Sequence, residues 1–366
     1  MSSLRWLLVV FAAVGTARAQ WEILPSGSTA DLRGIDAVGN GVAWASGTQG
    51  TVLRTTDEGK SWVRCATPPG AEGLDFRGVQ AFDASTAIVM SSGKGDLSRL
   101  YKTVDGCKSW KLAFTNPDAE GFWDGILMNR LESDGLLLGD PVAGQFSLWS
   151  TEDKGGTWSR YSSRYAPKTL TALPGESVFA ASNSSLTQDD HGRAIFGTGG
   201  AASARIFISG SADGGYDSHN VPLAGNTAAA GIFSIAFRTF LSQYVIGAAH
   251  FVAVGVDYTK ASESHGTAAY SVDNGETWHT AKTPPHGYRS AVAYDGVVKA
   301  WVTVGPNGTD VSTDDGRNWR ALRPNAAPQD PPDADQHWNA LSLPFVVGPH
   351  GRIGKLRPAA ITPVKP

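Results

Sequence analysis

Short stretches of apolar and small residues recur along the chain, and each is followed by a polar turn. Residues 42–47 and 136–139 are two of them, and both end in glycine. Such stretches predict β-strands whose side chains point alternately to opposite faces. Five more strands end in the same way, near Ser91, Gly197, Gly255, Gly305 and Gly348. No segment has the apolar spacing of a long helix, so we predict an all-β chain of seven similar units.

A second pattern, Ser/Thr-x-Asp-x-Gly-x-Ser/Thr-Trp, follows these strands in five full or near copies, and a sixth copy lacks the Trp. Its aspartates are Asp57, Asp105, Asp153, Asp213, Asp273 and Asp314. They are separated by 48, 48, 60, 60 and 41 residues, which fits one four-stranded sheet per repeat. An Asp carboxylate accepts backbone N–H bonds in its own turn, and glycine supplies the positive φ that the turn needs. We therefore predict that these aspartates are structural.

The last unit, about 337 to 356, has no outer strand of its own. Residues 21–25 match residues 319–324, which follow another of the Asp turns. We therefore expect the N-terminal strand to complete the last sheet. Such a closure leaves only short, protected edges. The predicted fold is a single seven-bladed β-propeller domain spanning residues 20–366.

The N-terminal segment reads as a secretory signal peptide. Arg5 precedes an apolar run over residues 6–14, and residues 17–19 place small residues at both cleavage positions. We set residues 1–19 apart from the fold and expect an exported protein, periplasmic or extracellular. No later stretch has about 18 uninterrupted apolar residues, so the sequence predicts no transmembrane segment in the mature chain. We expect a monomer.

Charge and composition exclude several classes of function. The chain has 31 Lys+Arg and 34 Asp+Glu, and removal of Arg5 and Arg18 leaves 29 against 34, a formal charge of -5. This balance argues against nucleic acid as the main partner. The histidines have no metal-ligand spacing, and Gly197–Gly200 lacks the strand-to-helix context of a dinucleotide loop. We expect neither a metal nor a cofactor.

Cys65 and Cys107 are the two cysteines of the chain. Export permits a disulfide. However, the repeat places Cys65 on an outer strand and Cys107 in the turn of the next unit. This arrangement favours two separate thiols, and the pairing stays open.

Candidate binding residues come from the start of each inner strand. Aligning these strands places Arg33, Arg77, Asp124, Phe233, Arg289 and Asn339 at one equivalent position. In a propeller this position lies at the mouth of the central channel. Three converging guanidiniums would bind a carboxylate, sulfate or phosphate group, because each offers paired donors and stays charged.

Two interpretations of the arginines remain open. Each can serve a ligand, or each can pair with a carboxylate of a neighbouring blade, for which Asp36, Asp124, Asp140 and Asp257 are available. The loops at 139–141 and 255–258 follow second strands and should edge the same face. The predicted binding set is Arg33, Arg77, Asp124, Asp140, Asp257, Tyr258, Arg289 and Asn339.

The whole mature chain resembles the photosystem II stability/assembly factor family and its bacterial relatives. The resemblance is carried by the blade opening Phe76–Gly78, the strand Trp44–Gly47 and the run Thr51–Trp62. The Asp turns are similar to Asp-boxes of the BNR repeat in sialidase- and sortilin-like propellers. This resemblance implies a non-enzymatic factor that uses an arginine-lined face to hold a protein partner during assembly.

A glycoside hydrolase is the alternative, because sialidases surround a substrate carboxylate with three arginines on a related propeller and xyloglucanase-like enzymes share Asp-boxes. Arg33, Arg77 and Arg289 would form the triad, with Asp124 as the acid. The Phe/Tyr-Arg-Ile-Pro signature is absent, and no Tyr–Glu pair is recognisable. Convergence of the three arginines in one open pocket, with Asp124 and a Tyr–Glu pair within contact distance, would favour hydrolysis of an acidic sugar.

Overall fold

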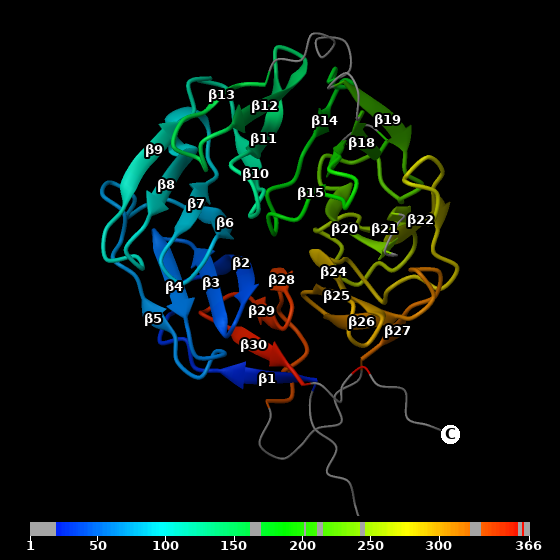
Figure 1. The fold of residues 1–366 in the computed structure, drawn as a ribbon. Coiled ribbons are helices and arrows are strands. Elements are labelled where there is room, and N and C mark those ends of the chain that lie inside the picture. The colour runs from blue at the N-terminus through cyan, green and yellow to red at the C-terminus, as the bar shows by residue number, and fades with distance from the viewer. Residues whose placement is uncertain are drawn as a thin grey trace, which may run out of the picture.

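The computed structural model of the protein is a ring of seven antiparallel sheets around a central axis (Figure 1). It describes residues 20–161, 170–200, 203–210, 215–241, 246–322, 331–357 and 361. Each blade is a four-stranded sheet, and the strand named first for each blade below lies nearest this axis. The predicted seven-bladed propeller is confirmed. The proposed signal peptide, residues 1–19, lies outside the described residues.

The blades follow the chain in order. Blade 1 contains β2 (Leu32–Gly39), β3 (Val42–Gly47), β4 (Thr51–Thr55) and β5 (Val63–Arg64). Blade 2 contains β6 (Phe76–Ala81), β7 (Ala87–Ser91), β8 (Arg99–Thr103) and β9 (Lys111–Thr115), with the 3₁₀ turn η1 (Gly95–Leu97). Blade 3 contains β10 (Trp123–Met128), β11 (Gly135–Val142), β12 (Gln145–Thr151) and β13 (Ser159–Arg160). Blade 4 contains β15 (Leu186–Gln188), β16 (Ala194–Gly197), β18 (Arg205–Ser209) and β19 (Tyr216–Asn220).

The remaining blades complete the ring. Blade 5 contains β20 (Ile232–Leu241), β21 (Ile246–Gly255), β22 (Ala268–Ser271) and β23 (His279–Thr280). Blade 6 contains β24 (Ala291–Asp295), β25 (Ala300–Gly305), β26 (Gly308–Ser312) and β27 (Arg320–Ala321). Blade 7 contains β28 (Ala340–Ser342), β29 (Phe345–Val347), β30 (Ile353–Leu356) and β1 (Trp21–Leu24). A separate two-stranded pair, β14 (Glu176–Ser177) with β17 (Gly199–Gly200), accompanies blade 4.

The N-terminal strand closes the ring. Strand β1 pairs antiparallel with β30, with Trp21 opposite Leu356 and Leu24 opposite Ile353 (Figure 1). Trp21 is fully buried, and its indole Nε1 donates a hydrogen bond to the Thr309 hydroxyl of blade 6 at 2.9 Å. The first strand therefore joins the two ends of the chain in one sheet, as the sequence predicts.

The Asp turns join the third and fourth strands of their blades. In blade 1 the Asp57 carboxylate accepts the Ser61 N–H at 2.9 Å and the Thr55 hydroxyl at 2.8 Å. The Thr55 hydroxyl in turn accepts the Gly59 N–H at 3.0 Å, and Gly59 has a φ of 83°. The same bonds recur around Asp105, Asp153, Asp273 and Asp314. Asp213 lies outside the described residues.

Cys65 and Cys107 form a disulfide, so the expectation of two separate thiols is wrong. Their Cα atoms are 5.3 Å apart, although one follows an outer strand and the other lies in the next blade's Asp turn. These two places meet because the outer strand of blade 1 packs against that turn. The Trp110 indole donates to the Ala66 carbonyl at 2.9 Å, and the Ala66 N–H donates to the Cys107 carbonyl.

Candidate functional site

The inner strands of four blades begin with the same irregularity. The pairing of the first two strands skips one residue at Arg33, Arg77, Asp124 and Phe233. A bulge of this kind leaves one residue unpaired and re-aims its side chain. All four side chains line one cavity. The same bulge in four blades therefore directs four different side chains into one cavity.

The cavity has a volume of about 500 Å³ and receives residues from all seven blades, so it lies on the ring axis. Six residues of the predicted binding set line it, namely Arg33, Arg77, Asp124, Asp140, Tyr258 and Asn339. The other lining residues are Phe122, Val178, Phe179, Ala180, Ala181, Ala228, Phe233, Tyr288, Ser290, Pro306 and Trp338. The sequence register indicated Phe233 as well, but not the remaining side chains.

A segment of blade 4 reaches into the centre of the ring beside this cavity. The Ala180 carbonyl accepts a hydrogen bond from the Nη1 of Arg77 in blade 2 at 3.2 Å. The Ser182 hydroxyl donates to the Ser290 carbonyl of blade 6 at 2.9 Å. Asn183 bonds both the N–H and the carbonyl of Ile126 in blade 3. The sequence register is ambiguous over residues 179–183, because blade 4 departs most from the repeat, so it assigned no role to these side chains.

The basic side of the cavity consists of Arg33 and Arg77, and Asp75 lies between them. The Nε of Arg77 donates to Asp75 at 2.8 Å, and the Nε of Arg33 lies 3.8 Å from the same carboxylate. The terminal nitrogens of Arg33 have no hydrogen-bond partner in the described part of the chain. Both arginine side chains are about one-third exposed, at 32% and 29%. Two guanidiniums therefore face the cavity around one shared carboxylate.

The neighbouring acidic residues are Asp124 and Asp140. Burial raises the pKa of Asp124 well above its usual range, and the charge of Asp140 raises it further, although Arg77 opposes the shift. Burial also raises the pKa of Asp140, whose Oδ1 accepts the Val178 N–H at 3.0 Å. The Oδ2 of Asp124 is buried without a hydrogen-bond partner. Burial thus disfavours the charged forms of both carboxyl groups.

Aromatic rings form the opposite side. Phe233 stacks on Phe179 with ring centroids 4.1 Å apart and meets Tyr288 edge-on at 4.9 Å. Tyr258 lies 6.1 Å from Phe233, and Trp338 also lines the cavity. Tyr288 and Trp338 precede the equivalent inner-strand position in blades 6 and 7, so the sequence register did not indicate them.

Arg289 does not line the cavity, and its assignment to the channel mouth is wrong. In blade 6, Ala291 pairs with Val304, so Ser290 occupies the position of Arg33 and Arg289 lies one residue earlier. Ser290 is the residue that lines the cavity. A shift of one residue moves a side chain to the other face of a strand. The alignment was therefore one residue out of register in this blade.

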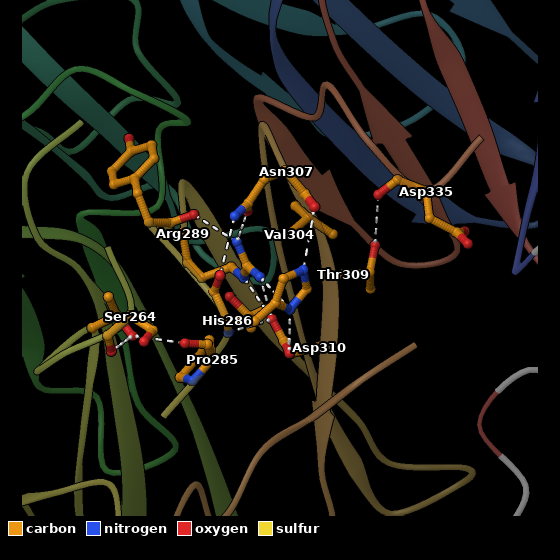
Figure 2. A network of polar contacts seen from close by, with 12 residues as sticks. Ser264, Pro285, His286, Arg289, Val304, Asn307, Thr309, Asp310 and Asp335 are labelled. Carbon is orange, nitrogen blue, oxygen red and sulfur yellow. Dashed lines mark hydrogen bonds and ion pairs between the residues drawn. The ribbon is translucent and has the colours of Figure 1, made fainter. Parts of the chain in front are cut away.

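The Arg289 guanidinium is fully buried inside blade 6 (Figure 2). Its Nε donates to Asp310 at 2.8 Å, and its Nη1 donates to the Asn307 side chain at 2.6 Å. Burial would raise the pKa of Asp310, but the hydrogen bond from His286 and the Arg289 charge lower it. Arg289 thus pairs with a carboxylate of its own blade, which is none of the four carboxylates named in the sequence analysis.

Asp257 also lies outside the cavity and lines a separate hollow with Lys260 and His265. Its Oδ1 accepts the Thr259 N–H at 3.0 Å, and its Oδ2 lies 3.7 Å from the Lys260 ammonium. These contacts bind its own loop, so its assignment to the shared binding face is wrong. Asn339 lines the cavity and also donates to the Leu32 carbonyl at 2.8 Å.

Within the residues that the structure describes, no group of three or more His, Cys, Asp or Glu side chains is arranged to hold a metal ion. In the same residues, no helix is long and apolar enough to cross a membrane.

No protein-family model and no curated protein matches the chain. Among solved structures, "YCF48 bound to D1 peptide" has a TM-score of 0.61 at 15% identity and covers 93% of this chain and 99% of its own. YCF48 from Cyanidioschyzon merolae has the same TM-score and coverage at 18% identity. The extracellular domain of the putative hybrid two-component system BT4673 of B. thetaiotaomicron has a TM-score of 0.59 at 9% identity, covering 92% of this chain and 39% of that one. The chain thus shares its propeller fold with YCF48 over nearly its whole length.

Proposed function

We propose that this protein is a binding factor that holds an anionic segment of a protein partner in the central cavity. The single observation that carries the proposal is the placement of Arg33 and Arg77 around Asp75 in a cavity of about 500 Å³. Guanidiniums bind carboxylates with paired, directed donors. Asp75 holds Arg77 by a hydrogen bond at 2.8 Å and lies 3.8 Å from the Nε of Arg33.

The electrostatics support an anionic ligand. Asp75 offsets only one of the two arginine charges. Burial raises the pKa of Asp124 and of Asp140, which disfavours their charged forms. A cavity that excludes part of the surrounding water strengthens the remaining attraction. The interaction should weaken as salt concentration rises, because the arginines are partly exposed.

The fold neighbours support a protein partner. YCF48, a photosystem II assembly factor, has been solved with a D1 peptide. A propeller of the same fold and length is therefore known to hold a peptide. We extend this to the present chain as a partner-binding role in assembly, carried out by a monomer.

Export belongs to the same proposal. Cleavage after Ala19 would release a chain that starts at Gln20, with strand β1 intact. Mass spectrometry of the secreted or periplasmic protein should give this N-terminus. A chain that retains residues 1–19 in the cytoplasm would contradict the proposal of export.

The three arginines that motivated the glycoside hydrolase alternative do not meet in one pocket. It required Arg33, Arg77 and Arg289 in one pocket, but Arg289 is buried in an ion pair with Asp310. No Tyr–Glu pair lines the cavity in the described part of the chain. Asp124 is only 1% exposed, so its carboxyl group is poorly placed to protonate a glycosidic oxygen.

The test uses fluorescently labelled peptides in matched pairs that differ only by Glu or Gln. We expect the acidic member of a binding pair to bind the mature protein, and the Arg33→Ala and Arg77→Ala variants to lose this preference. Arg64→Ala is the matched control, because Arg64 is exposed on the outer strand β5. Equal binding of both peptides, or the same loss in Arg64→Ala, would contradict the proposed function, as would release of sugar from an acidic glycoside by the wild type alone.

A further inference from the structure

Among the aromatic residues that line the cavity, Phe233 and Tyr288 are buried, whereas Tyr258 is exposed. Phe233 and Tyr288 are almost completely buried, at 3% and 6% exposure, and they pack edge to face. Tyr258 lies against Phe233 at 74° between ring planes, but 54% of it is exposed. It is therefore a large ring that lines the cavity and still offers surface to a ligand.

The backbone before Tyr258 adopts a conformation that its sequence disfavours. Val256 has a φ of 88°, in the left-handed region, where a β-branched side chain is strained. The Val256 N–H donates to the Gly231 carbonyl at 2.9 Å, and the Tyr258 N–H donates to the Ala229 carbonyl at 3.3 Å. Asp257 adds the hydrogen bond to the Thr259 N–H described above.

These contacts hold the strained turn in place and fix the position of Tyr258. A strained non-glycine residue persists only where its surroundings impose it, and such residues cluster at ligand-binding sites.

We infer that Tyr258, together with the neighbouring rings of Phe233 and Tyr288, binds an aromatic or other large apolar side chain of the partner. This side chain would lie next to the anionic group held by the two arginines. The inference rests on the proposed function and specifies its partner. The same cavity is lined by the guanidiniums of Arg33 and Arg77 and by the aromatic rings around Tyr258. The complementary segment carries an acidic group and a bulky apolar side chain as close neighbours. An aromatic pair adds affinity beyond the area that it buries.

The probes are two small acids, propionate and 3-phenylpropionate, titrated into the mature chain and followed by NMR. Both carry the carboxylate, but only the second carries a ring. We expect 3-phenylpropionate to bind about tenfold more tightly, since a ring contact of about 1 to 1.5 kcal/mol corresponds to that factor. Phenethylamine carries the ring with a positive charge and should bind more weakly than 3-phenylpropionate.

Variants separate the two halves of the cavity. Tyr258→Ser should reduce the tenfold ratio to about twofold, whereas Tyr258→Phe should retain it, because the ring remains. Phe240→Ser is the matched control, an exposed aromatic residue on β20 that does not line the cavity. Arg77→Ala should weaken both acids and leave their ratio in place.

The outcomes distinguish the inference from the proposed function. Equal binding of both acids to the wild type, with loss of both in Arg77→Ala, would overturn the inference and leave the proposed function standing. An unchanged ratio in Tyr258→Ser would overturn it as well. Binding of 3-phenylpropionate that depends on Tyr258 but not on either arginine would contradict the proposed function instead.

Discussion

The Nε of Arg77 donates a hydrogen bond to the Asp75 carboxylate at 2.8 Å. Its Nη1 donates to the Ala180 carbonyl at 3.2 Å, so these two bonds fix the plane of the guanidinium. The remaining N–H groups of the Arg77 guanidinium can therefore donate to a ligand without a change in side-chain conformation. The geometry of this side chain, and not only its charge, prepares the basic side of the cavity.

Arg77→Lys tests that argument. Lysine keeps the charge but has a single donor atom, which cannot serve Asp75, Ala180 and a ligand in the same geometry. We expect binding of an acidic peptide or of 3-phenylpropionate to weaken by about tenfold, as expected for loss of a well-formed charged hydrogen bond of about 1.5 kcal/mol. The measurement is a titration of the wild type and of Arg77→Lys at one salt concentration. Full affinity in Arg77→Lys would show that charge alone suffices.

The arginines also show how far the sequence alone carries the prediction. The repeat predicted seven blades and the closing strand, because the Asp turns and the strand ends occur at regular intervals. It placed Arg33 and Arg77 correctly at the cavity. It misplaced Arg289, because Arg289–Ser290 in blade 6 resembles Arg77–Gly78 in blade 2. Only the pairing of strands shows which residue of such a pair occupies the bulge position.

The blade 4 segment and the disulfide could not be predicted for a related reason. Both depend on contacts between blades, whereas a repeat pattern describes the inside of one blade. Ala180 and Ser182 reach partners in blades 2 and 6. Cys65 meets Cys107 because adjacent blades pack outer strand against turn. Such contacts leave no periodic signal in a single sequence.

Asp124→Asn should stabilise the protein at neutral pH. Because burial raises the pKa of Asp124, the native state binds this proton more tightly than the unfolded state, in which the pKa is about 3.9. The protonated Asp124 therefore stabilises the native state fully below the unfolded-state pKa, and this stabilisation is lost as pH rises through the native-state pKa. Asparagine has no such titration. The melting temperature of Asp124→Asn relative to wild type should therefore rise from about pH 4 towards pH 7.

Asp57→Asn is the control with the opposite sign. Hydrogen bonds from Ser61 and Thr55 lower the pKa of Asp57 to about 2. Its stabilising contribution is present above the unfolded pKa and is lost as pH falls towards 2. This substitution should therefore destabilise the protein most at neutral pH. Parallel pH profiles for the two variants, measured by calorimetry, would contradict at least one of the two assignments.

The Cys65–Cys107 bond should contribute substantially to stability. It links residues 42 positions apart. Closing a loop of that length restricts the unfolded chain and stabilises the native state by roughly 2 to 4 kcal/mol. The double variant Cys65→Ser/Cys107→Ser should lose this amount in urea unfolding. Wild type under reducing conditions should match the double variant, whose own stability should not respond to the reductant.

Trp21 anchors the closing strand β1 to blades 6 and 7. It is completely buried, packs against Trp338 with ring centroids 6.0 Å apart, and bonds Thr309 in the neighbouring blade. Trp21→Ala should cost roughly 3 to 5 kcal/mol, the range for removal of a large buried aromatic side chain. Glu22→Ala is the control, because Glu22 is exposed in the same strand. If closure depends on β1, the Trp21 variant should also become more sensitive to proteolysis near β30, whose edge β1 covers. Equal urea midpoints for the two variants would mean that the other six blades hold the ring without this strand.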